Sequence, residues 1–380
     1  MTETAARVRP RFTSRLHDQR TAAWLGIALG VTFSICFVTG LWSHLQQNPP
    51  SWFDPPARPA GLYRFTQGLH VATGIATIPI LLAKLWVVYP KLFRRPMFTG
   101  IASLLERISL IPLIGGGIFM VFTGLANINL WYPWPFNFRT SHYWIAWITI
   151  GALLVHVGAK LTTTRVAISR PALADPEIAA ASSVDRRGFL LLVGGGAAML
   201  TAFTVGQTVW PLRKLALLAP RRPDTGPQGF PVNRSAVAAG VVSAAQDPAY
   251  RLIVEGNVRH PLELSLANLH ALPQHSAVLP IACVEGWSAS REWRGVRVRD
   301  LLTMAGAPAE ARVRVHSLQQ RRSYKESDLD PAQAHDVDTL LALAVEGEPL
   351  HLDHGYPLRL IGPNRPGVLQ TKWVTRLVVS

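Results

Sequence analysis

The chain carries the stretch Pro280-Ile281-Ala282-Cys283-Val284-Glu285-Gly286-Trp287-Ser288, followed by Trp293-Arg294-Gly295-Val296. Cys283 is the only cysteine in the polar C-terminal half of the sequence. The second cysteine, Cys36, lies deep in an apolar run, so a disulfide between the two is not expected. A lone thiol in this setting predicts a metal ligand or a nucleophile.

Outward from this stretch, composition divides the 380 residues into two parts. Up to about Trp210 the chain is a series of long apolar segments, and beyond it a mixed, proline-rich sequence is long enough for one cored domain. Each apolar segment approaches the roughly 20 residues that a bilayer requires. We expect five membrane spans, at roughly Thr21–His44, Phe65–Tyr89, Ile108–Trp131, His142–Thr163 and Gly188–Trp210.

The basic residues predict the orientation of these spans. They gather before the first span, between the second and third, and between the fourth and fifth, whereas the opposite loops carry only Arg58, Arg64 and Arg139. By the positive-inside rule the N-terminus is cytoplasmic and the C-terminal domain periplasmic or extracellular, in a multi-pass protein of the cytoplasmic (inner) membrane. Much of the net charge of +15 then comes from basic residues that flank membrane spans, which argues against nucleic-acid binding.

Histidines inside apolar helices are costly and usually functional. His142 and His156 are fourteen residues apart in the fourth span, which places them within about 40° of one helix face and about 21 Å apart along its axis. That separation suits two haems stacked across a membrane. His70 lies at the depth of His142 near the outer surface, and His17 can meet His156 near the inner one.

These residues resemble the di-haem cytochrome b subunits of formate dehydrogenases and nickel-iron hydrogenases. The resemblance rests on the Arg11-Phe12-Thr13-Ser14-Arg15-Leu16-His17 opening, on Gly68-Leu69-His70 with Gly74, and on the His142/His156 spacing. It implies that the four histidines bind the iron of two b-type haems and that the bundle exchanges electrons with quinone. His17 could instead be solvated beside Asp18. We interpret His44 as an interfacial polar residue, with a role in a quinone site as the alternative.

Ser182-Ser183-Val184-Asp185-Arg186-Arg187-Gly188-Phe189-Leu190 precedes the fifth span and is similar to a twin-arginine export signal, which is read by a receptor for folded passengers. The alternative is that both arginines are ordinary membrane anchors. The sequence thus predicts a cytochrome b membrane domain followed by an exported domain. The expected boundaries are 1–165 for the cytochrome, 166–187 for a cytoplasmic linker, 188–212 for the fifth helix, 213–247 for a second linker and 248–380 for the exported domain.

The exported domain shows strand-like runs separated by proline and glycine turns, such as Arg251–Gly256 and Leu358–Ile361. Short helices are expected at Leu264–Ala271 and Arg299–Ala305, which gives a β-rich α+β fold. The Cys283 block, together with His270-Ala271-Leu272-Pro273 and Asp353-His354-Gly355-Tyr356-Pro357-Leu358-Arg359, resembles the molybdopterin-binding domain of the sulfite oxidase superfamily.

This second resemblance implies a site. Cys283 would be the thiolate ligand of molybdenum, and Tyr324 would line the metal pocket as a catalytic residue. Four basic residues would hold the molybdopterin and its phosphate, a task that suits cationic donors: His354, Arg359, Arg365 and Lys372.

The residues after the thiol depart from sulfite oxidases, which place arginines there. Here Val284-Glu285-Gly286-Trp287-Ser288 follows, and the next arginine is Arg291. This pattern is similar to the periplasmic protein-methionine-sulfoxide reductases of the superfamily. We expect an acidic and aromatic entrance that repels sulfite and accepts a neutral S-oxide, which can be a small molecule or bound to a protein.

The sequence therefore predicts a membrane-bound molybdopterin-dependent oxidoreductase that passes electrons from quinol through two b haems to an external molybdenum site. The reverse flow, from an oxidised external substrate of the sulfite type into quinone, is the first alternative. A non-enzymatic redox relay or assembly subunit is the second. The sequence indicates no particular quinone, substrate or oligomeric state.

Overall fold

A computed structural model describes residues 15–92, 100–169, 185–320 and 324–380. The expected haem-binding opening up to Ser14, and the part of the twin-arginine stretch up to Val184, lie outside these residues. The chain forms two compact units. The first unit consists of Met1–Phe37, Ala72–Ala126 and Tyr132–Thr201, and the second of Val38–Val71, Asn127–Trp131 and Ala202–Ser380.

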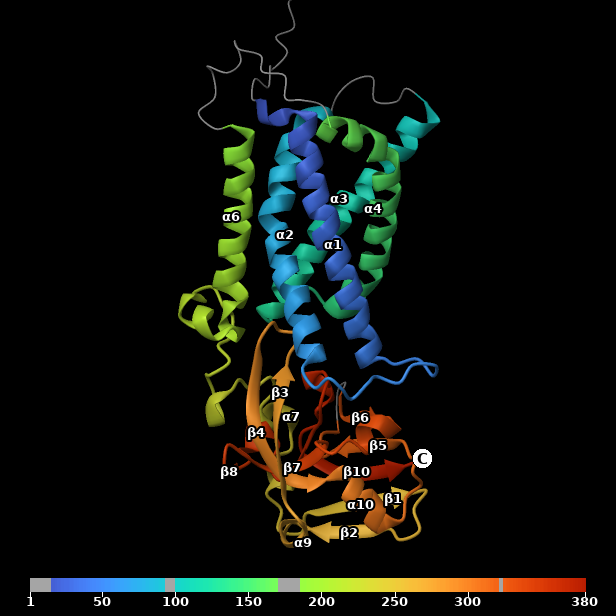
Figure 1. The fold of residues 1–380 in the computed structure, drawn as a ribbon. Coiled ribbons are helices and arrows are strands. Elements are labelled where there is room, and N and C mark those ends of the chain that lie inside the picture. The colour runs from blue at the N-terminus through green and yellow to red at the C-terminus, as the bar shows by residue number, and fades with distance from the viewer. Residues whose placement is uncertain (1–14, 93–99, 170–184, 321–323) are drawn as a thin grey trace, which may run out of the picture. The chain divides into compact units, whose positions relative to one another are not determined.

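The apolar segments form long helices. Within the described residues, five helices are long and apolar enough to cross a membrane, which confirms the predicted fold class of the N-terminal part. They are α1 (Gln19–Gln47), α2 (Leu62–Leu92), α3 (Ile101–Ile128), α4 (Phe138–Ser169) and α6 (Arg186–Val205), with the 3-10 turn η1 (Arg15–His17) before α1 (Figure 1).

Side chains of α1, α2 and α6 share one apolar cluster in the first unit, with Leu25, Ile80 and Ala197 among its buried members. Aspartates satisfy amide groups that have no partner within the first turn of a helix. The Thr21 amide donates to Asp18 Oδ1 at 2.5 Å, and the Gly188 amide donates to Asp185 Oδ1 at 2.8 Å. The starts of α1 and α6 are thus locally encoded.

The second unit contains two five-stranded sheets. The first has the order β2-β1-β10-β5-β6 and the second the order β3-β4-β7-β8, with β9 also paired to β7. Their bounds are β1 (Arg251–Gly256), β2 (Leu262–Ser265), β3 (His275–Ala282), β4 (Ser288–Arg297), β5 (Val313–Ser317), β6 (Glu326–Leu329), β7 (Leu340–Val345), β8 (Glu348–Pro349), β9 (Arg359–Ile361) and β10 (Val374–Val379).

Short helices complete this unit, and two of them confirm sequence expectations to within two residues. These are α9 (Leu266–Ala271) and α10 (Val298–Ala305). A reciprocal cap begins α9, because Asn268 N donates to Ser265 Oγ while Ser265 N donates to the Asn268 side chain. The others are α7 (Ala236–Ala239), α8 (Val242–Ala245), α11 (Pro331–Ala334), η2 (Gly206–Thr208), η3 (Trp210–Leu215), η4 (Pro227–Gly229), η5 (Leu352–His354) and η6 (Gly367–Leu369).

Alternation along the strands builds the core of the first sheet. Leu252 and Val254 of β1 are fully buried while their neighbours are more exposed, as a strand with one face on a core requires. They belong to one apolar cluster with residues of α10 and β10, such as Leu301 and Leu377. The β-rich α+β class expected for the C-terminal domain is thereby confirmed.

The second sheet positions the thiol. Strands β3 and β4 are antiparallel and pair as far as Ala282 and Ser288, so residues 283–287 form the turn between them. The Cys283 amide donates to the Trp287 carbonyl at 3.0 Å, which closes this turn. Cys283 therefore lies where a rigid hairpin reverses.

Residues of the predicted linker pack against the C-terminal domain. Phe230, expected in a linker over 213–247, is 1% exposed and belongs to the same apolar cluster as Trp293 and Ile361. Ser235 caps α7 through a hydrogen bond from the Ala238 amide, and the Ala236 amide donates to Asp353 Oδ1 at 2.7 Å. The structure thus packs the end of the expected linker into the domain.

Candidate active site

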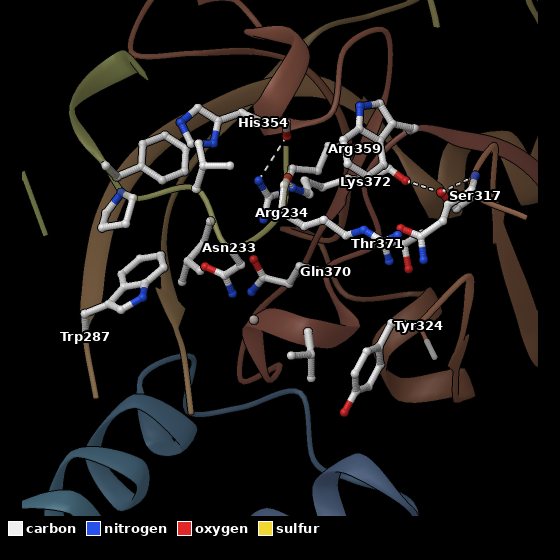
Figure 2. Close-up of a pocket in the computed structure, with 18 residues that line it drawn as sticks. Asn233, Arg234, Trp287, Ser317, Tyr324, His354, Arg359, Gln370, Thr371 and Lys372 are labelled. Carbon is white, nitrogen blue, oxygen red and sulfur yellow. Dashed lines mark hydrogen bonds between the residues drawn. The ribbon is translucent and has the colours of Figure 1, made fainter. Parts of the chain in front are cut away.

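A cavity of about 150 Å³ lies in the C-terminal domain. Its walls come from four parts of the sequence that the fold brings together: the segment 230–234, the end of β3 with Trp287, Ser317 and Gln319 with Tyr324, and residues between 354 and 373. Figure 2 shows His354, Arg359 and Lys372 close together on one side, Trp287 and Tyr324 at two other sides, and Asn233 and Gln370 between them.

A feature of the backbone explains why the basic residues of the cavity wall lie close together. His354 ends η5 and is followed by Gly355, whose φ of +112° is a conformation that residues with a Cβ rarely adopt. A Cβ there would lie 3.1 Å from Lys372 Cβ and 3.2 Å from Arg359 Cβ. The missing side chain therefore allows the η5 turn to approach both basic residues.

His354 is buried and held as a neutral ring. It stacks on Phe230 with ring centroids 3.7 Å apart, and its Nε2 is 2.7 Å from the Pro227 carbonyl oxygen. Burial, followed by the charge of Arg359, lowers the pKa of His354 to about 3. We expect Nε2 to carry the proton that the carbonyl accepts.

Arg359 and Lys372 are cations held by backbone oxygens. Arg359 Nη1 donates to the His354 carbonyl at 3.0 Å, and Lys372 Nζ donates to the carbonyls of Arg234 and Asp353 at 2.5 and 2.9 Å. Burial lowers the pKa of Arg359 to about 9 and that of Lys372 to about 7, the latter helped by the charge of Arg359. The pKa values fall because charge in this region is poorly solvated.

Two residues of the cavity wall carry polar atoms with unsatisfied hydrogen-bonding capacity in the described part of the chain. Arg359 Nε and Gln370 Oε1 are buried without a hydrogen-bond partner in the described part of the chain. Buried polar atoms of this kind are costly unless a ligand or water satisfies them. Poorly solvated cations and unsatisfied polar atoms on one wall fit an anionic, polar ligand such as a phosphate-bearing cofactor.

Cys283 is buried directly behind this cavity. Its side chain is 1% exposed, and its Sγ accepts a hydrogen bond from the Asn233 amide, which lines the cavity, at 3.1 Å. Burial, followed by the charge of Glu285, raises the pKa of the thiol to about 12. Without a metal the sulfur is therefore protonated, and a metal bound to the thiolate would displace that proton.

The structure brings Tyr324 to the cavity as the sequence predicted. Its side chain lines the wall, and its backbone has a φ of +68°. A non-glycine residue in this left-handed region is uncommon and is often found at functional sites. Tyr324 and Cys283 are about forty residues apart in the sequence and belong to the same compact unit.

Arg365 is separated from the other predicted cofactor-binding residues. It is absent from the cavity lining, and its guanidinium donates to Gln333 Oε1 and to the carbonyls of Asp328 and Leu369. Both Arg359 and Arg365 are buried, but only Arg359 reaches the cavity. Arg365 therefore ties β6, α11 and η6 together inside the domain.

The residues that follow the thiol differ in their relation to the cavity. Glu285 is 8% exposed and is absent from the cavity lining, and its carboxylate accepts from Trp287 Nε1 at 3.1 Å and lies 3.4 Å from Arg221 Nε. Arg291 is also absent from the lining; its guanidinium donates to the carbonyls of Pro223 and Gly229 and lies 5.8 Å from the ring centroid of the lining residue Phe230. Trp287 lines the cavity, and the acidic and aromatic entrance stays a prediction.

Sequence reasoning missed several polar residues that line the cavity, among them Asn233, Arg234, Ser317, Gln319 and Gln370. Asn233 and Arg234 fell within the expected linker. Their signal was Phe230-Pro231-Val232, an aromatic residue, a proline and an aliphatic residue immediately before an Asn-Arg pair, which is unusual for a solvated linker. Gln370 lies two residues before Lys372, and its role depends on burial that sequence does not reveal.

The four candidate haem ligands lie on or beside the long helices and are partly buried. In the first unit, His142 Nδ1 is 2.8 Å from Thr123 Oγ1, and His17 Nδ1 is 3.0 Å from the Val87 carbonyl oxygen. In the second unit, His70 Nδ1 is 3.2 Å from Thr39 Oγ1. His156 lies in α4.

A comparison with protein families places the C-terminal part. Residues 239–380 match the family model described as "Oxidoreductase molybdopterin binding domain". The match covers less than half of the chain and includes Cys283, Tyr324, His354, Arg359, Arg365 and Lys372.

Similar proteins share this part of the chain. The "Putative protein-methionine-sulfoxide reductase subunit YedZ1" of Azospira oryzae is 34% identical over 132 residues, which are 35% of this chain and 49% of that protein. The mitochondrial sulfite oxidase of Drosophila melanogaster is 31% identical over 163 residues, 34% of this chain and 27% of that protein. The "Uncharacterized oxidoreductase YuiH" of Bacillus subtilis is 35% identical over 126 residues, 33% of this chain and 62% of that protein.

Proposed function

Because its C-terminal part is a molybdopterin-binding oxidoreductase domain, we propose that this chain reduces an S-oxide or a similar external substrate with electrons from membrane quinol. Quinol releases two electrons and two protons and becomes quinone. The S-oxide takes up two electrons and two protons, its S–O bond breaks, and a thioether and water are formed. The wall of poorly solvated cations beside the buried Cys283 is the observation that carries this proposal.

The residues present fit the cofactor. Arg359 and Lys372 would bind its phosphate, because their hydrogen-bonded acceptors in the structure are backbone carbonyls and their charge favours an anion. Gln370 and Asn233 offer amide groups suited to a polar heterocycle. Cys283 would supply a thiolate to molybdenum, and the bound group would supply two-electron oxygen-atom transfer.

The substrate class rests on the aromatic side of the cavity. Trp287 and Tyr324 present ring surfaces, and no arginine directly follows Cys283. A neutral S-oxide with an apolar substituent suits these surfaces, whereas sulfite would need additional cationic donors. The Tyr324 hydroxyl could donate a hydrogen bond to the oxygen of the substrate. Similarity to the Azospira protein, whose name includes methionine-sulfoxide reductase, supports this choice.

The reverse reaction is the second candidate. It would oxidise a sulfite-type substrate with water as the oxygen source and pass two electrons to quinone. The similarity to sulfite oxidases favours it, as does the positive charge of the cavity wall. The two directions differ in which partner, quinol or the external substrate, reduces the protein.

For the membrane part we propose two b haems with His70 and His142 as ligands of the outer one and His17 and His156 as ligands of the inner one. The Nδ1 contacts of His70 and His142 with threonine hydroxyls support the assignment, because ligating histidines are usually oriented through the other ring nitrogen. The five apolar helices support a bilayer location. The N-terminus would be cytoplasmic and the C-terminal domain external, exported with Arg186 and Arg187 as a twin-arginine signal.

The test uses the purified full-length protein and its two cysteines. We expect one molybdenum and two b haems per chain, and reoxidation of the quinol-reduced haems by methionine sulfoxide. Cys283→Ser should abolish this reoxidation, because a poorly ionised hydroxyl replaces the thiolate, while Cys36→Ser should leave it intact. Haem reduction by sulfite would establish the reverse direction, and a wild-type protein without molybdenum would favour the redox relay.

A further inference from the structure

The turn that carries Cys283 is held by residues from outside the molybdopterin-binding domain. Asn127 Nδ2, in the last turn of α3, donates to the Val284 carbonyl at 3.2 Å. Gln207 Nε2, in η2, donates to the Gly286 carbonyl at 3.1 Å. Neither residue belongs to the matched segment 239–380, yet both lie in the same compact unit as the turn.

Packing at the apex of the turn adds to these two hydrogen bonds. Gly286 has a φ of +82°, and a Cβ there would lie 3.3 Å from Val71 Cγ1 and 3.6 Å from Ile128 Cγ2. Val71 follows His70 in α2, and Ile128 follows Asn127 at the end of α3. The apex therefore sits against two helical segments with little room for a side chain.

The residue between Val284 and Gly286 is held by an ion pair and a hydrogen bond. Glu285 accepts from Trp287 Nε1 and pairs with Arg221, which precedes the matched domain. Arg221 Nη1 also donates to the Val232 carbonyl at 2.8 Å, next to the cavity residue Asn233. Val284, Glu285 and Gly286 are thus each fixed by a group outside residues 239–380.

We propose that Asn127 and Gln207 are positioning residues that set the place of the Cys283 sulfur. The inference rests on the proposed role of Cys283 as metal ligand, and it adds that the helical segments fix the geometry of that ligand. Two side-chain amides that donate to the carbonyls of Val284 and Gly286 in a five-residue turn restrict how far the thiol can move. The site is accordingly incomplete when the domain is considered without residues 71, 127, 128, 207 and 221.

The first experiment measures how readily the turn opens when no cofactor is bound, by the rate at which Cys283 is alkylated. Full-length protein is produced in cells that cannot make molybdopterin, and alkylation by a maleimide is followed by mass spectrometry. The variants are Asn127→Leu, Gln207→Met and the double change, with the exposed Asn129→Leu as matched control. Cys36 in α1 is an internal reference in every sample, because the chain has two cysteines.

We expect alkylation of Cys283 to become roughly fivefold faster in each single variant, because one hydrogen bond of about 1 kcal/mol no longer opposes opening of the turn. The rate at Cys36, and both rates in Asn129→Leu, should stay at the wild-type values. Unchanged Cys283 reactivity in the double variant would show that the domain holds the turn alone, and would overturn the proposal.

A second measurement reports the sulfur in the loaded protein. Electron paramagnetic resonance of Mo(V) is sensitive to the orientation of a thiolate ligand, so we expect shifted g values in Asn127→Leu and Gln207→Met and unchanged values in Asn129→Leu. Identical spectra in all four proteins would contradict positioning. If wild type gives no Mo(V) signal, the proposed function fails, while the alkylation experiment still decides whether the turn is clamped.

Loss of folding is also informative. Asn127→Asp and Gln207→Glu keep the side-chain shape and remove the donor group, and they replace the first variants if those do not fold. If the donor-free variants of both residues fail to fold while Asn129→Leu folds normally, the contacts act on folding of the unit, and the positioning role is refuted.

Discussion

Two regions of the C-terminal unit use the same residue types in opposite ways. On the cavity wall, Arg359 and Lys372 donate to backbone carbonyls, and burial lowers their pKa values. In the segment before α2, Arg58 donates two hydrogen bonds to the Asp336 carboxylate, each at 2.9 Å, and a further one to Asp338. These carboxylates raise the pKa of Arg58 above its ordinary value.

The two regions differ in the group that neutralises the charge of the basic side chains. Arg58 has its counter-ions within the chain, so its role is complete in the folded protein, and its half-exposed side chain limits the energy gained. The cavity cations are held at a cost that an anionic ligand would remove. Opposite pKa shifts of one residue type thus distinguish a structural contact from a binding wall.

Lys372→Met gives the largest expected effect. In cofactor-free full-length protein, we expect the affinity for sulfate to fall by roughly 100-fold, because a charge-assisted contact to an anion contributes about 2 to 3 kcal/mol. The stabilisation of the protein by sulfate in thermal unfolding measures this affinity. The exposed Lys325→Met is the matched control and should bind sulfate as wild type does; equal loss in both variants would remove the distinction between the two regions.

The pH dependence of the same binding sharpens the comparison. Because the pKa of Lys372 is about 7 in the empty cavity and 10.5 ordinarily, the empty protein gains stability as pH rises above 7, where only the unfolded state keeps the proton. Sulfate needs the charged form, so its affinity should decrease by up to about tenfold per unit between pH 7 and 8. Lys372→Met should abolish that slope; a slope that persists would assign the proton to another group.

Arg58→Ala gives the smallest expected effect. We expect the free energy of unfolding of the C-terminal unit to decrease by less than about 1 kcal/mol, with sulfate affinity unchanged, because the guanidinium is half exposed and its ion pairs are screened. Urea unfolding at low and high salt measures this, and Arg312→Ala, which breaks the exposed pair with Asp54, should behave alike. Loss of sulfate binding in Arg58→Ala would show that the two regions are coupled.

The prediction of the fold from sequence succeeded where local pattern decides structure. The five apolar helices were predicted from length and hydropathy, the helices at 264–271 and 299–305 were also expected, and the resemblance of the C-terminal part to molybdopterin-binding domains is confirmed by the family match. Phe230 lies in the linker predicted over 213–247 and packs against Trp293 in the structure, a contact that sequence alone does not reveal.

The candidate site was predicted in part. Tyr324, His354, Arg359 and Lys372 converge on one cavity, and Cys283 is hydrogen-bonded to a residue of its wall. The haem ligands, the export signal and the direction of electron flow stay predictions. Arg365, predicted at the cofactor, and Glu285, predicted at the entrance, do not line that cavity and contact other residues of the protein.

The sequence by itself determined the chemistry available: a lone thiol, a set of basic residues near the C-terminus and apolar helices bearing histidines. These follow from residue type and spacing along the chain, which sequence records directly. Only the tertiary structure decided that Arg359 faces a cavity while Arg365 binds carbonyls, and that Asn127 and Gln207 hold the turn of Cys283. Such assignments depend on which distant segments share a hydrogen bond or exclude water, and folding alone brings those segments together.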